Sequence, residues 1–359
     1  MAKPGERFNQ KKFVVRFAAT EQINNQKSCA MKYTRWGIIG PGKIAHDFAK
    51  DLALLDGPQT ITAVLGKQIE EAKSFAHSYS APQVFTKLDE FIEKAGIDIA
   101  YIATPHTLHH KEALACLQHN IPVLCEKPMT INLDQCDELI AASREHHTFL
   151  MEGMWIRFLP GIKQSLAMVE RGDIGRIISV KASMGFKAPK DPNSRLFNPD
   201  LGGGSLLDLG IYPVFLSVLL MGRPTAINAT ATLTKQGIDE HCSILFKYPN
   251  GQQAILESTL LSDKNVAAEI TGDKGSIRIL DPWFEKSEGL EIEINGKGKV
   301  IYPTRWQGHG LHFEATEALS CLRDNKIESD LLPHRFSREL IGIMDEIRQQ
   351  IHVSYEMYE

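Results

Sequence analysis

The stretch WGIIGPGKIAHDFAKDLALL, residues 36–55, decides the fold of the first part of the chain. It consists of a short apolar strand, a glycine turn and a helical pattern, and the turn matches GxGxx(G/A) with Gly40, Gly42 and Ala45. The first glycine of such a turn permits a tight bend, the second lets a pyrophosphate approach the backbone, and the small third residue keeps helix and strand close. The helix N-terminus then favours phosphate. The stretch predicts a dinucleotide-binding turn; the alternative is a glycine turn that only joins strand to helix.

Three further strand-and-helix pairs follow this stretch, with strands at TITAVLG (60–66), IDIAYIAT (97–104) and IPVLC (121–125). These strands are continuous apolar runs rather than alternating ones, as expected when helices cover both faces of a sheet. The pattern predicts an α/β dinucleotide-binding (Rossmann) domain over residues 31–153, with a parallel, doubly wound sheet.

The pattern changes after Met154, where strand candidates alternate or are rich in threonine and are separated by turn signals such as YPNG (248–251) and GDKG (272–275). The candidates are IISVKASMGF (177–186), ATATLT (229–234), HCSILFKY (241–248), QQAILESTL (252–260), AAEITG (267–272), GSIRIL (275–280) and LEIEIN (290–295). Helical patterns lie near 160–171, 205–221, 310–324 and 335–351. We expect an α+β domain over residues 154–359, built on a large, mostly antiparallel open sheet, with the last helix packing back on the first domain.

The net charge and composition of the chain limit which kinds of molecule it is expected to bind. The chain has 359 residues and a formal net charge of -4, which argues against nucleic acid or an anionic membrane as a partner. Residues 1–30 are basic and are expected to be a disordered or non-native extension, with Met31 as a sensible native start. No later apolar stretch is expected to be long enough to span a membrane. Six scattered cysteines without CxxC spacing indicate a reduced, cytoplasmic protein.

The end of the second strand bears on the choice of cofactor. Enzymes that bind NAD usually place an acid there to hold the ribose 2′-hydroxyl. Here the run is Val64-Leu65-Gly66-Lys67-Gln68, with a base and no acid. A carboxylate would repel a 2′-phosphate whereas Lys67 could pair with it, so NADP is the expected cofactor. The alternative is that Lys67 is a solvated loop residue.

Two motifs carry the candidate chemistry. VLCEKP (123–128) ends a parallel strand at the edge where doubly wound sheets bind ligands. GGGSLLDLGIYP (202–213) places Asp208 and Tyr212 four residues apart, on one face of a helix. Taken alone, the residues leave alternatives open, because Asp208 could form a capping box with Ser205 and Tyr212 could be a core aromatic.

The chain resembles the glucose–fructose oxidoreductase / inositol dehydrogenase (Gfo/Idh/MocA) family from Met31 nearly to its end. The matching motifs are GPGKIA (40–45), ATPH (103–106), CEKP (125–128) and GGGSLLDLGIY (202–212). Within the family it is most similar to the branch of dimeric dihydrodiol dehydrogenases and NADP-dependent D-xylose dehydrogenases. That similarity rests on RWGIIG, VLCEKP, FLMEGMWIRFLP (149–160), LLDLGIYP and the ITGDKG…PWF run (270–284).

The resemblance implies roles for the two motifs. Many family members carry His where this chain has Tyr212, and a phenol with an ordinary pKa near 10 suits neutral pH poorly as a general acid/base. A neighbouring ammonium would lower that pKa, and Lys127 is the family residue placed to do so. Asp208 would orient the substrate or the Lys–Tyr pair, and Glu126 would anchor the loop or the cofactor. The family also implies a cis peptide bond before Pro128.

The resemblance also implies where the ligands bind. The expected cofactor-binding residues are Gly40, Pro41, Gly42, Lys43, Ile44, Gly66, Lys67, Thr104, Pro105, His106, Glu126 and Lys127. Besides Asp208 and Tyr212, the residues expected at the substrate are Trp155, Arg157, Phe186 and Trp283; the last four could instead be core residues. The histidines at 106, 109 and 110 suit the cofactor crevice better than a metal site, and no metal is expected.

These expectations combine into an NADP-dependent oxidoreductase that moves hydride between nicotinamide and a carbon of a sugar or cyclic diol, with Lys127, Asp208 and Tyr212 as catalytic residues. The runner-up is an NAD-dependent inositol-type polyol dehydrogenase. A rival from another class is a non-catalytic dinucleotide-binding regulator, since the fold also supports binding alone. By resemblance, a homodimer or higher homo-oligomer through the second sheet is expected.

Overall fold

The parallel sheet forms from the predicted apolar runs with two short strands added. The computed structural model describes residues 33–263, 267–355 and 358, so the expectation for residues 1–30 lies outside the described part. In that part, six parallel strands take the order β3-β2-β1-β4-β5-β6. They are β1 (Thr34–Ile39), β2 (Gln59–Leu65), β3 (Gln83–Phe85), β4 (Ile99–Ile102), β5 (Val123–Glu126) and β6 (Leu150–Gly153). The strands missed by the sequence patterns are β3, which has three residues, and β6, which contains a glutamate.

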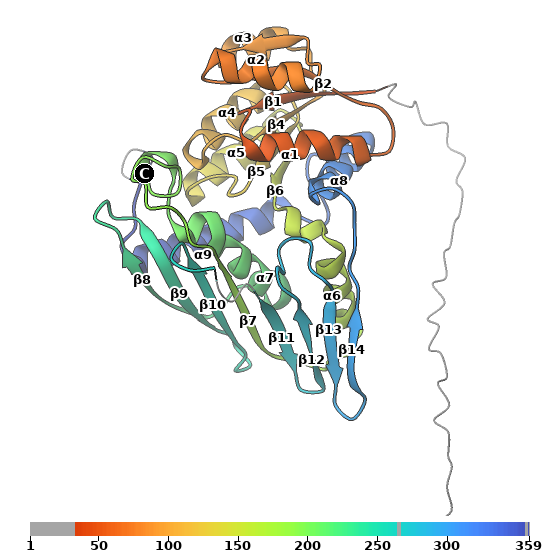
Figure 1. Ribbon diagram of the computed structural model, residues 1–359, viewed down its shortest axis with the longest axis vertical. Helices are drawn as coiled ribbons and strands as arrows, with labels where there is room; N and C mark the ends of the chain where they lie inside the picture. Colours follow the sequence, from red (N-terminus) through yellow and green to blue (C-terminus); the bar gives the residue numbers. More distant parts are fainter. Residues whose placement is uncertain (1–32, 264–266, 356–357, 359) are drawn as a thin grey trace, which may run out of the picture. The chain divides into compact units, whose positions relative to one another are not determined.

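Helices connect these strands, and their N-termini point to the carboxyl edge of the sheet (Figure 1). They are α1 (Lys43–Asp51), α2 (Ile69–Ser78), α3 (Leu88–Lys94), α4 (His106–Gln118) and α5 (Leu133–Glu145). The strand cores are almost free of solvent, as for Ile38, Val64, Tyr101 and Leu124. Burial on both faces explains why the strands read as continuous apolar runs.

The second sheet has eight strands in the order β14-β13-β12-β11-β7-β10-β9-β8, and only the central β7–β10 pair is parallel. The strands are β7 (Ile177–Gly185), β8 (Ala226–Leu233), β9 (Asp239–Lys247), β10 (Gln253–Thr259), β11 (Ala268–Gly272), β12 (Gly275–Ile279), β13 (Leu290–Ile294) and β14 (Gly298–Tyr302). The edge strand β14 is exposed throughout, so it shows no burial period and no sequence pattern marked it.

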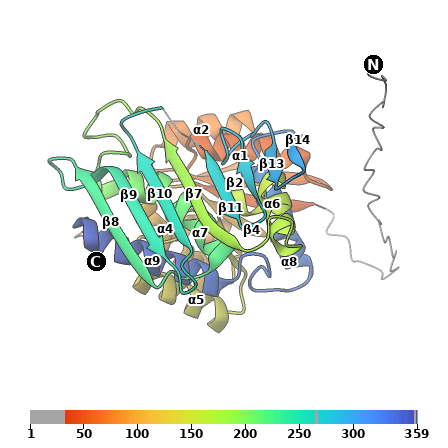
Figure 2. The ribbon, with the colours of Figure 1, turned by 90° about the horizontal axis from the view of Figure 1, so that it is seen from below.

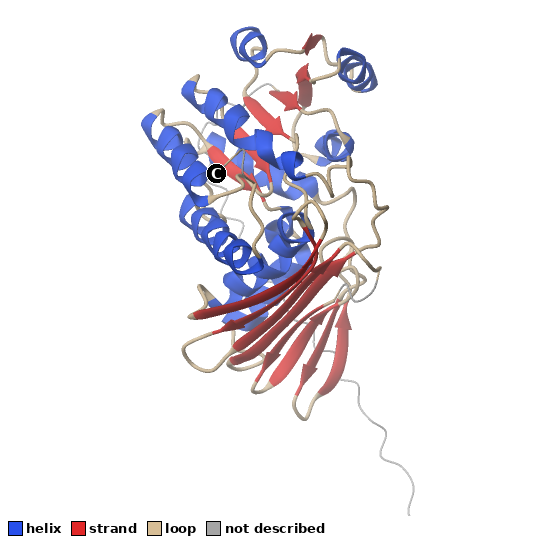
Figure 3. Ribbon diagram, turned by 90° about the vertical axis from the view of Figure 1, so that its left-hand side faces the viewer, coloured by secondary structure: helices blue, strands red, loops and turns tan. Residues whose placement is uncertain are grey.

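Helices cover one face of this sheet and leave the other face bare (Figures 2 and 3). The covering helices are α6 (Pro160–Glu170), α7 (Ile211–Met221) and α9 (His334–Ile351). The stretch Pro199–Met221 is the described helical run long and apolar enough to cross a membrane, and 83% of its apolar window is buried inside the protein. It serves here as a core helix, which corrects the expectation that no stretch would have that length and composition.

The chain crosses back to the parallel sheet after β14. Helix α8 (Leu311–Arg323) contacts α1, and α9 contacts α5, where Arg338 forms an ion pair with Asp137 at 2.6 Å. The described residues from Tyr33 onward thereby form one compact unit around both sheets.

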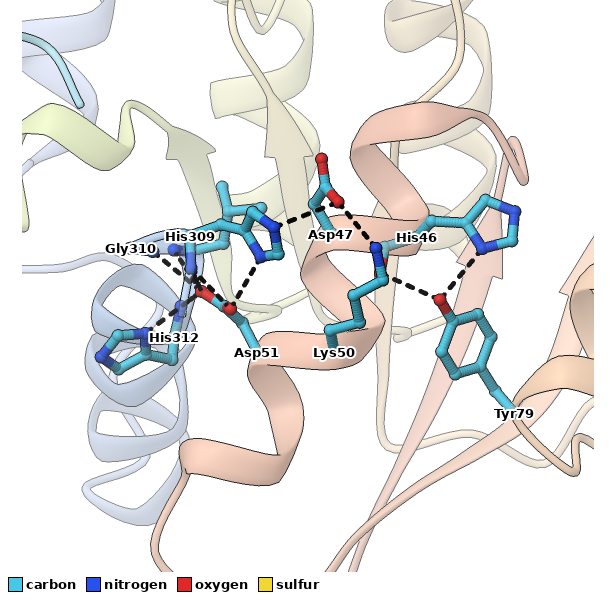
Figure 4. Close-up of polar contacts among 9 residues, drawn as sticks. His46, Asp47, Lys50, Asp51, Tyr79, His309, Gly310 and His312 are labelled. Atoms are coloured by element: carbon cyan, nitrogen blue, oxygen red, sulfur yellow. Dashed lines mark hydrogen bonds and ion pairs between the residues drawn. The ribbon is translucent and has the colours of Figure 1, made fainter. Parts of the chain in front are cut away.

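Asp51 fixes the start of α8 against α1 (Figure 4). Its buried carboxylate accepts hydrogen bonds from the backbone N–H groups of His309, Gly310 and Leu311 at 2.7–3.0 Å. The rings of His309 and His312 approach the same carboxylate at 3.1 and 3.2 Å. Burial alone would raise the pKa of Asp51, but these donors outweigh it and the pKa lies below its ordinary value. The contact holds two segments of the candidate site together.

Candidate active site

A cleft of about 890 Å³ lies at the carboxyl edge of the parallel sheet, where doubly wound folds bind ligands. It runs from the N-terminus of α1 to the start of α7, so both predicted motifs open into one space. Its walls come from segments of both the parallel and the second sheet and from the loops between them. The lining residues are Gly42, Lys43, Ile44, Asp47, Ala103, Thr104, Pro105, His106, His109, Glu126, Lys127, Trp155, Met184, Arg195, Asp208, Leu209, Tyr212, Phe284, Glu285, Lys286, His309 and Leu311.

The glycine turn forms one end of the cleft. Gly40 has φ +87°, and a Cβ there would lie 2.7–2.9 Å from Thr104 and Ala103, so glycine is required for the close approach to that loop. A Cβ at Gly42, in contrast, would meet nothing within 4 Å. No side chain caps α1 at Gly42 and its first turn contains no acid, so its N–H groups are available to an anion. The open space and the uncapped helix fit a pyrophosphate.

The end of β2 lies beside this turn. A Cβ at Gly66 would lie 3.0 Å from Pro41 Cγ, so Gly66 allows the two turns to pack against each other. Lys67 follows it, is exposed, and does not line the cleft. The cleft is therefore lined by Gly42, Lys43 and Ile44. The other four expected residues of the two turns do not line it, namely Gly40, Pro41, Gly66 and Lys67.

The ATPH segment forms the floor. The His106 ring donates from Nδ1 to the carbonyl oxygen of Gly202 at 3.1 Å, and its Nε2 lies 3.8 Å from Asp208 Oδ1. Burial lowers the pKa of His106 well below its ordinary value, so the ring is neutral. Thr104 donates its hydroxyl proton to Glu112, and His109 lies 2.8 Å from the carbonyl oxygens of both Thr104 and Pro128.

The histidines whose spacing could suggest a metal site contact protein groups instead. His110 pairs with Glu138 at 2.8 Å, and both nitrogens of His109 face carbonyl oxygens. Among the described residues, His, Cys, Asp and Glu form no group of three or more that could hold a metal ion.

Lys127, Asp208 and Tyr212 meet in the middle of the cleft, although 81 or more residues separate the first from the other two. The Lys127 Nζ donates to the backbone carbonyl oxygen of Asp208 at 2.7 Å and lies 3.5 Å from its carboxylate. The same ammonium lies 4.6 Å from the centroid of the Tyr212 ring. The peptide bond between Lys127 and Pro128 is cis, as the resemblance implies.

The backbone explains why this carbonyl oxygen is available to Lys127. Residues Leu206–Gly210 form a π-helical turn, where each carbonyl oxygen would accept from the N–H five residues later. For Asp208 that residue is Pro213, which has no N–H. The ammonium of Lys127 donates to this oxygen instead. Pro213 is the sequence signal that could have predicted this contact.

Asp239 replaces the capping box that the sequence left open. The hydroxyl of Ser205 donates to Asp239 Oδ2 at 2.6 Å, and the Leu206 N–H donates to the same oxygen at 2.7 Å. Asp208 is thus free of any capping role. Its carboxylate instead accepts two hydrogen bonds from Arg195, Nη1 to Oδ1 at 2.8 Å and Nη2 to Oδ2 at 3.2 Å.

The phenol of Tyr212 does not behave as the resemblance implies. Burial raises its pKa well above the ordinary value, and the charge of Glu126 raises it further. The expectation that Lys127 brings this pKa toward neutrality is therefore not met, because the ammonium lies over the ring and burial dominates. The one hydrogen bond that opposes the rise comes from the indole N–H of Trp155, which donates to the phenol oxygen at 2.9 Å.

Glu126 has a partner that the sequence did not reveal. The buried hydroxyl of Tyr101 donates to Glu126 Oε1 at 2.5 Å, and the backbone N–H of Lys127 reaches Oε2 at 3.3 Å. Burial raises the pKa of Glu126. The side chain anchors the end of β5 and also lines the cleft.

Aromatic side chains form the wall beside Tyr212. Its ring stacks on Phe284, with centroids 6.2 Å apart, and Trp155, which donates to its phenol oxygen, also lines the cleft. Arg157, Phe186 and Trp283, which the sequence analysis expects at the substrate, do not line the cleft. Arg157 donates to the carbonyl oxygen of Leu331, Phe186 is exposed, and Trp283 is buried with its N–H on the Ser183 carbonyl oxygen. Trp283 supports its neighbour Phe284 by an edge-on contact.

Comparison with known proteins adds two kinds of result. Residues 34–154 match a family model described as "Oxidoreductase family, NAD-binding Rossmann fold", and residues 162–278 match "GFO/IDH/MocA C-terminal domain". A trans-1,2-dihydrobenzene-1,2-diol dehydrogenase from Xenopus tropicalis is 34% identical over 333 residues, which are 90% of this chain and 99% of that protein.

Solved structures share the fold. An aldose–aldose oxidoreductase from Caulobacter crescentus, in complex with glycerol, aligns with a TM-score of 0.81 at 22% identity over 89% of this chain and 98% of that one. The 3-ketoreductase KijD10 from Actinomadura kijaniata, in complex with NADP and TDP-benzene, aligns with a TM-score of 0.77 at 23% identity over the same shares.

Proposed function

Since the chain belongs to the Gfo/Idh/MocA family of oxidoreductases and is a dinucleotide-dependent dehydrogenase or reductase of polyols or diols, we propose that it acts with NADP(H) on a sugar or cyclic diol, of the D-xylose or trans-dihydrodiol type. Lys127, Asp208 and Tyr212 are the proposed catalytic residues. The single observation that carries the proposal is the meeting of these three side chains in the cleft that begins at the uncapped N-terminus of α1.

The residues of the cleft fit a dinucleotide. Gly42, Lys43 and Ile44 would receive the pyrophosphate, while Thr104, Pro105, His106 and Glu126 would surround the nicotinamide end. When bound, the nicotinamide supplies or accepts the hydride. The neutral His106 would add no charge at the nicotinamide end of the cleft.

Tyr212 is the proposed general acid and base for the substrate oxygen. With a raised pKa the phenol keeps its proton at neutral pH, so it is ready to donate to the oxygen of a carbonyl substrate as that oxygen gains negative charge. Trp155 leaves the Tyr212 O–H free to point into the cleft, because the indole occupies the phenol oxygen as a donor. In the oxidative direction Tyr212 must first lose its proton, so that direction is favoured by high pH.

Lys127 supplies electrostatic stabilisation. Its ammonium lines the cleft and is held by the Asp208 carbonyl oxygen, so little reorganisation is needed when an alkoxide develops nearby. Burial lowers the pKa of Lys127, while the charge of Asp208 opposes that shift. Asp208 keeps the ammonium in position.

The preference for NADP rests on the end of β2. Lys67 is exposed, directly follows Gly66 and is the first charged residue after the strand, a suitable position for pairing with a 2′-phosphate. The second candidate is an NAD-dependent inositol-type dehydrogenase, which the shared catalytic set would also serve. Relative affinities for NADPH and NADH separate the two.

A non-catalytic dinucleotide-binding regulator is the rival from another class. Such a protein has no need for an acid/base phenol, an ammonium and an ionised carboxylate in contact beside the cofactor cleft. All three are present here, which favours the enzyme.

The proposed assembly is a homodimer or higher homo-oligomer through the bare face of the second sheet. Ile255 on β10 is about half exposed there, an unusual setting for an isoleucine on a central strand. We also propose a cytoplasmic location, since the five described cysteines are free and buried. Sedimentation of the purified protein tests the first proposal.

The deciding experiment follows reduced cofactor by absorbance at high protein concentration with a panel of pentoses, hexoses and cyclic diols, in wild type and Tyr212→Phe. We expect turnover with at least one substrate, nearly abolished in Tyr212→Phe while the dissociation constant for NADPH stays almost unchanged. Tight NADPH binding without turnover on any substrate would favour the regulator. Wild-type activity in Tyr212→Phe would refute the assigned role of Tyr212.

A further inference from the structure

Arg195 lies in a loop outside the motifs of the sequence analysis, and both of its terminal nitrogens donate hydrogen bonds to the carboxylate of Asp208. The two N···O distances are 2.8 and 3.2 Å, one to each carboxylate oxygen. A planar guanidinium matches a carboxylate in this two-bond geometry, which fixes the orientation of both groups. Arg195 itself lines the cleft.

The loop that carries Arg195 is built to lie against the start of the π-helical turn. Phe197 is buried, and the Gly204 N–H donates to the carbonyl oxygen of Leu196 at 2.9 Å. A Cβ at Gly203 would lie 2.8–3.0 Å from the carbonyl oxygens of Leu196, Asn198 and Arg195. Gly203 is therefore required for the close approach of this loop, so the position of Arg195 is part of the fold.

The charges around Asp208 are unequal. Two cations face its single negative charge, Arg195 from the loop and Lys127 from the end of β5. The other polar groups around it are the neutral His106 of α4, Glu126 of β5 and the phenol of Tyr212. Arg195 lies nearer to the carboxylate than the ammonium does, by 2.8 against 3.5 Å for the shared oxygen.

We propose that Arg195 is a positioning residue that neutralises Asp208, so that the ammonium of Lys127 is not neutralised by that carboxylate and can stabilise the substrate oxygen. The inference rests on the proposed function and adds a residue to it. Lys127 and Asp208 are already within ion-pair distance, at 3.5 Å. Without Arg195, Lys127 would be the one cation left to balance the Asp208 carboxylate, and the field of the ammonium at the substrate oxygen would largely cancel.

The shifted pKa values agree with this arrangement. After burial and the acids Asp208 and Glu126, the charge of Arg195 is the next influence on Lys127, and it lowers the pKa of the ammonium. Lys127 and Arg195 together hold the pKa of Asp208 well below its ordinary value despite burial. Arg195 and Tyr212 also interact, since a phenolate next to a guanidinium is stabilised.

The test compares Arg195→Met and Arg195→Lys with wild type on the substrate that the panel identifies. For Arg195→Met we expect kcat to fall by about 10- to 100-fold, and the alkaline rise of kcat for oxidation to move to higher pH because the phenolate loses a cation. Arg195→Lys keeps the charge and should keep the wild-type pH profile with a smaller loss. Millimolar guanidinium should partly restore Arg195→Met. The dissociation constant for NADPH should stay within about twofold.

A second readout does not depend on turnover. Lysines methylated with ¹³C-formaldehyde titrate individually by NMR, and Lys127→Arg identifies the Lys127 resonance. We expect that resonance to titrate at higher pH in Arg195→Met, because a repelling cation is gone. Arg176→Met is the matched control, since Arg176 also pairs with an aspartate, Asp273, through an exposed contact. It should change neither readout.

The outcomes separate the two proposals. If wild type turns over no substrate, the proposed function fails, and the Lys127 titration still decides the role of Arg195. If Arg195→Met loses thermal stability or activity with unchanged pH profile and unchanged Lys127 titration, Arg195 only fastens its loop and the inference is overturned.

Discussion

The indole N–H of Trp155 donates to the phenol oxygen of Tyr212 at 2.9 Å. The family resemblance implies a place for Trp155 at the substrate, and Trp155 does line the cleft, but its indole N–H is bonded to the phenol. Because a hydrogen bond donated to an oxygen stabilises its anionic form, this contact opposes the rise in the pKa of Tyr212 that burial causes.

The first prediction concerns that bond. In Trp155→Phe the pKa of Tyr212 should rise further, so the alkaline limb of kcat for oxidation should move to higher pH and kcat should fall by about tenfold. A pH profile of initial rates checks both. Trp36→Phe is the control, since Trp36 is a buried indole that donates to Gln59 away from the cleft. A higher KM with an unmoved limb would mean that Trp155 only shapes the substrate wall.

The second prediction concerns cofactor choice. Lys67→Glu puts a carboxylate where NAD enzymes usually hold the ribose hydroxyl and removes the proposed partner of the 2′-phosphate. We expect the affinity for NADPH to fall by roughly 10- to 100-fold and that for NADH to hold or improve, as measured by fluorescence titration. Lys94→Glu, an exposed change at the end of α3, controls for net charge. A clear NADH preference in wild type would contradict the assignment.

The fold was predictable because its strands and helices carry strong local signals. Buried parallel strands are apolar throughout and the glycine turn has a fixed chemistry, so β1, β2, β4 and β5 follow from the sequence alone. Short β3 and exposed β14 lack such signals, since three residues show no period and an exposed edge strand has no buried face.

The residues of the candidate site were predictable from the sequence only where they belong to a recognisable motif. Arg195 lies in an irregular loop 13 residues before Asp208, and nothing in its neighbours indicates that the loop folds onto the helix. Phe284 was missed by one position, because which of two adjacent aromatic residues faces a cleft depends on the local course of the loop. The raised pKa of Tyr212 depends on burial, which residue types alone do not give.

The third prediction concerns Asp239, which anchors the helix that carries Asp208 and Tyr212. Burial raises the pKa of Asp239 to about 6, although Ser205 and Leu206 donate to it. The folded state therefore holds this proton more tightly than the unfolded state, and stability is lost as pH rises from about 4 to about 6, by roughly 3 kcal/mol. In Asp239→Asn this loss should disappear.

Denaturant unfolding of wild type and Asp239→Asn at pH 5 and pH 7.5 checks it. The amide oxygen of asparagine can still accept from Ser205 and Leu206, so the variant should keep its cofactor affinity. Equal pH dependence in the two proteins would show that Asp239 is ionised throughout this range.

The fourth prediction concerns Asp51, whose carboxylate fixes the N-terminus of α8 to α1 (Figure 4). Asp51→Ala leaves several buried N–H groups without an acceptor, so the free energy of unfolding at pH 7 should fall by about 3 kcal/mol. Because the pKa of Asp51 is lowered by folding, its contribution is present above about pH 4 and is lost as pH falls, so the gap to wild type should narrow in acid.

The affinity of Asp51→Ala for NADPH should also fall, since His309 and Leu311 line the cleft. Asp47→Ala removes a neighbouring carboxylate that pairs with the exposed side chains of Lys50 and His309, and it should cost less than about 1 kcal/mol. Equal losses in the two variants would mean that the backbone contacts of Asp51 contribute nothing beyond its charge.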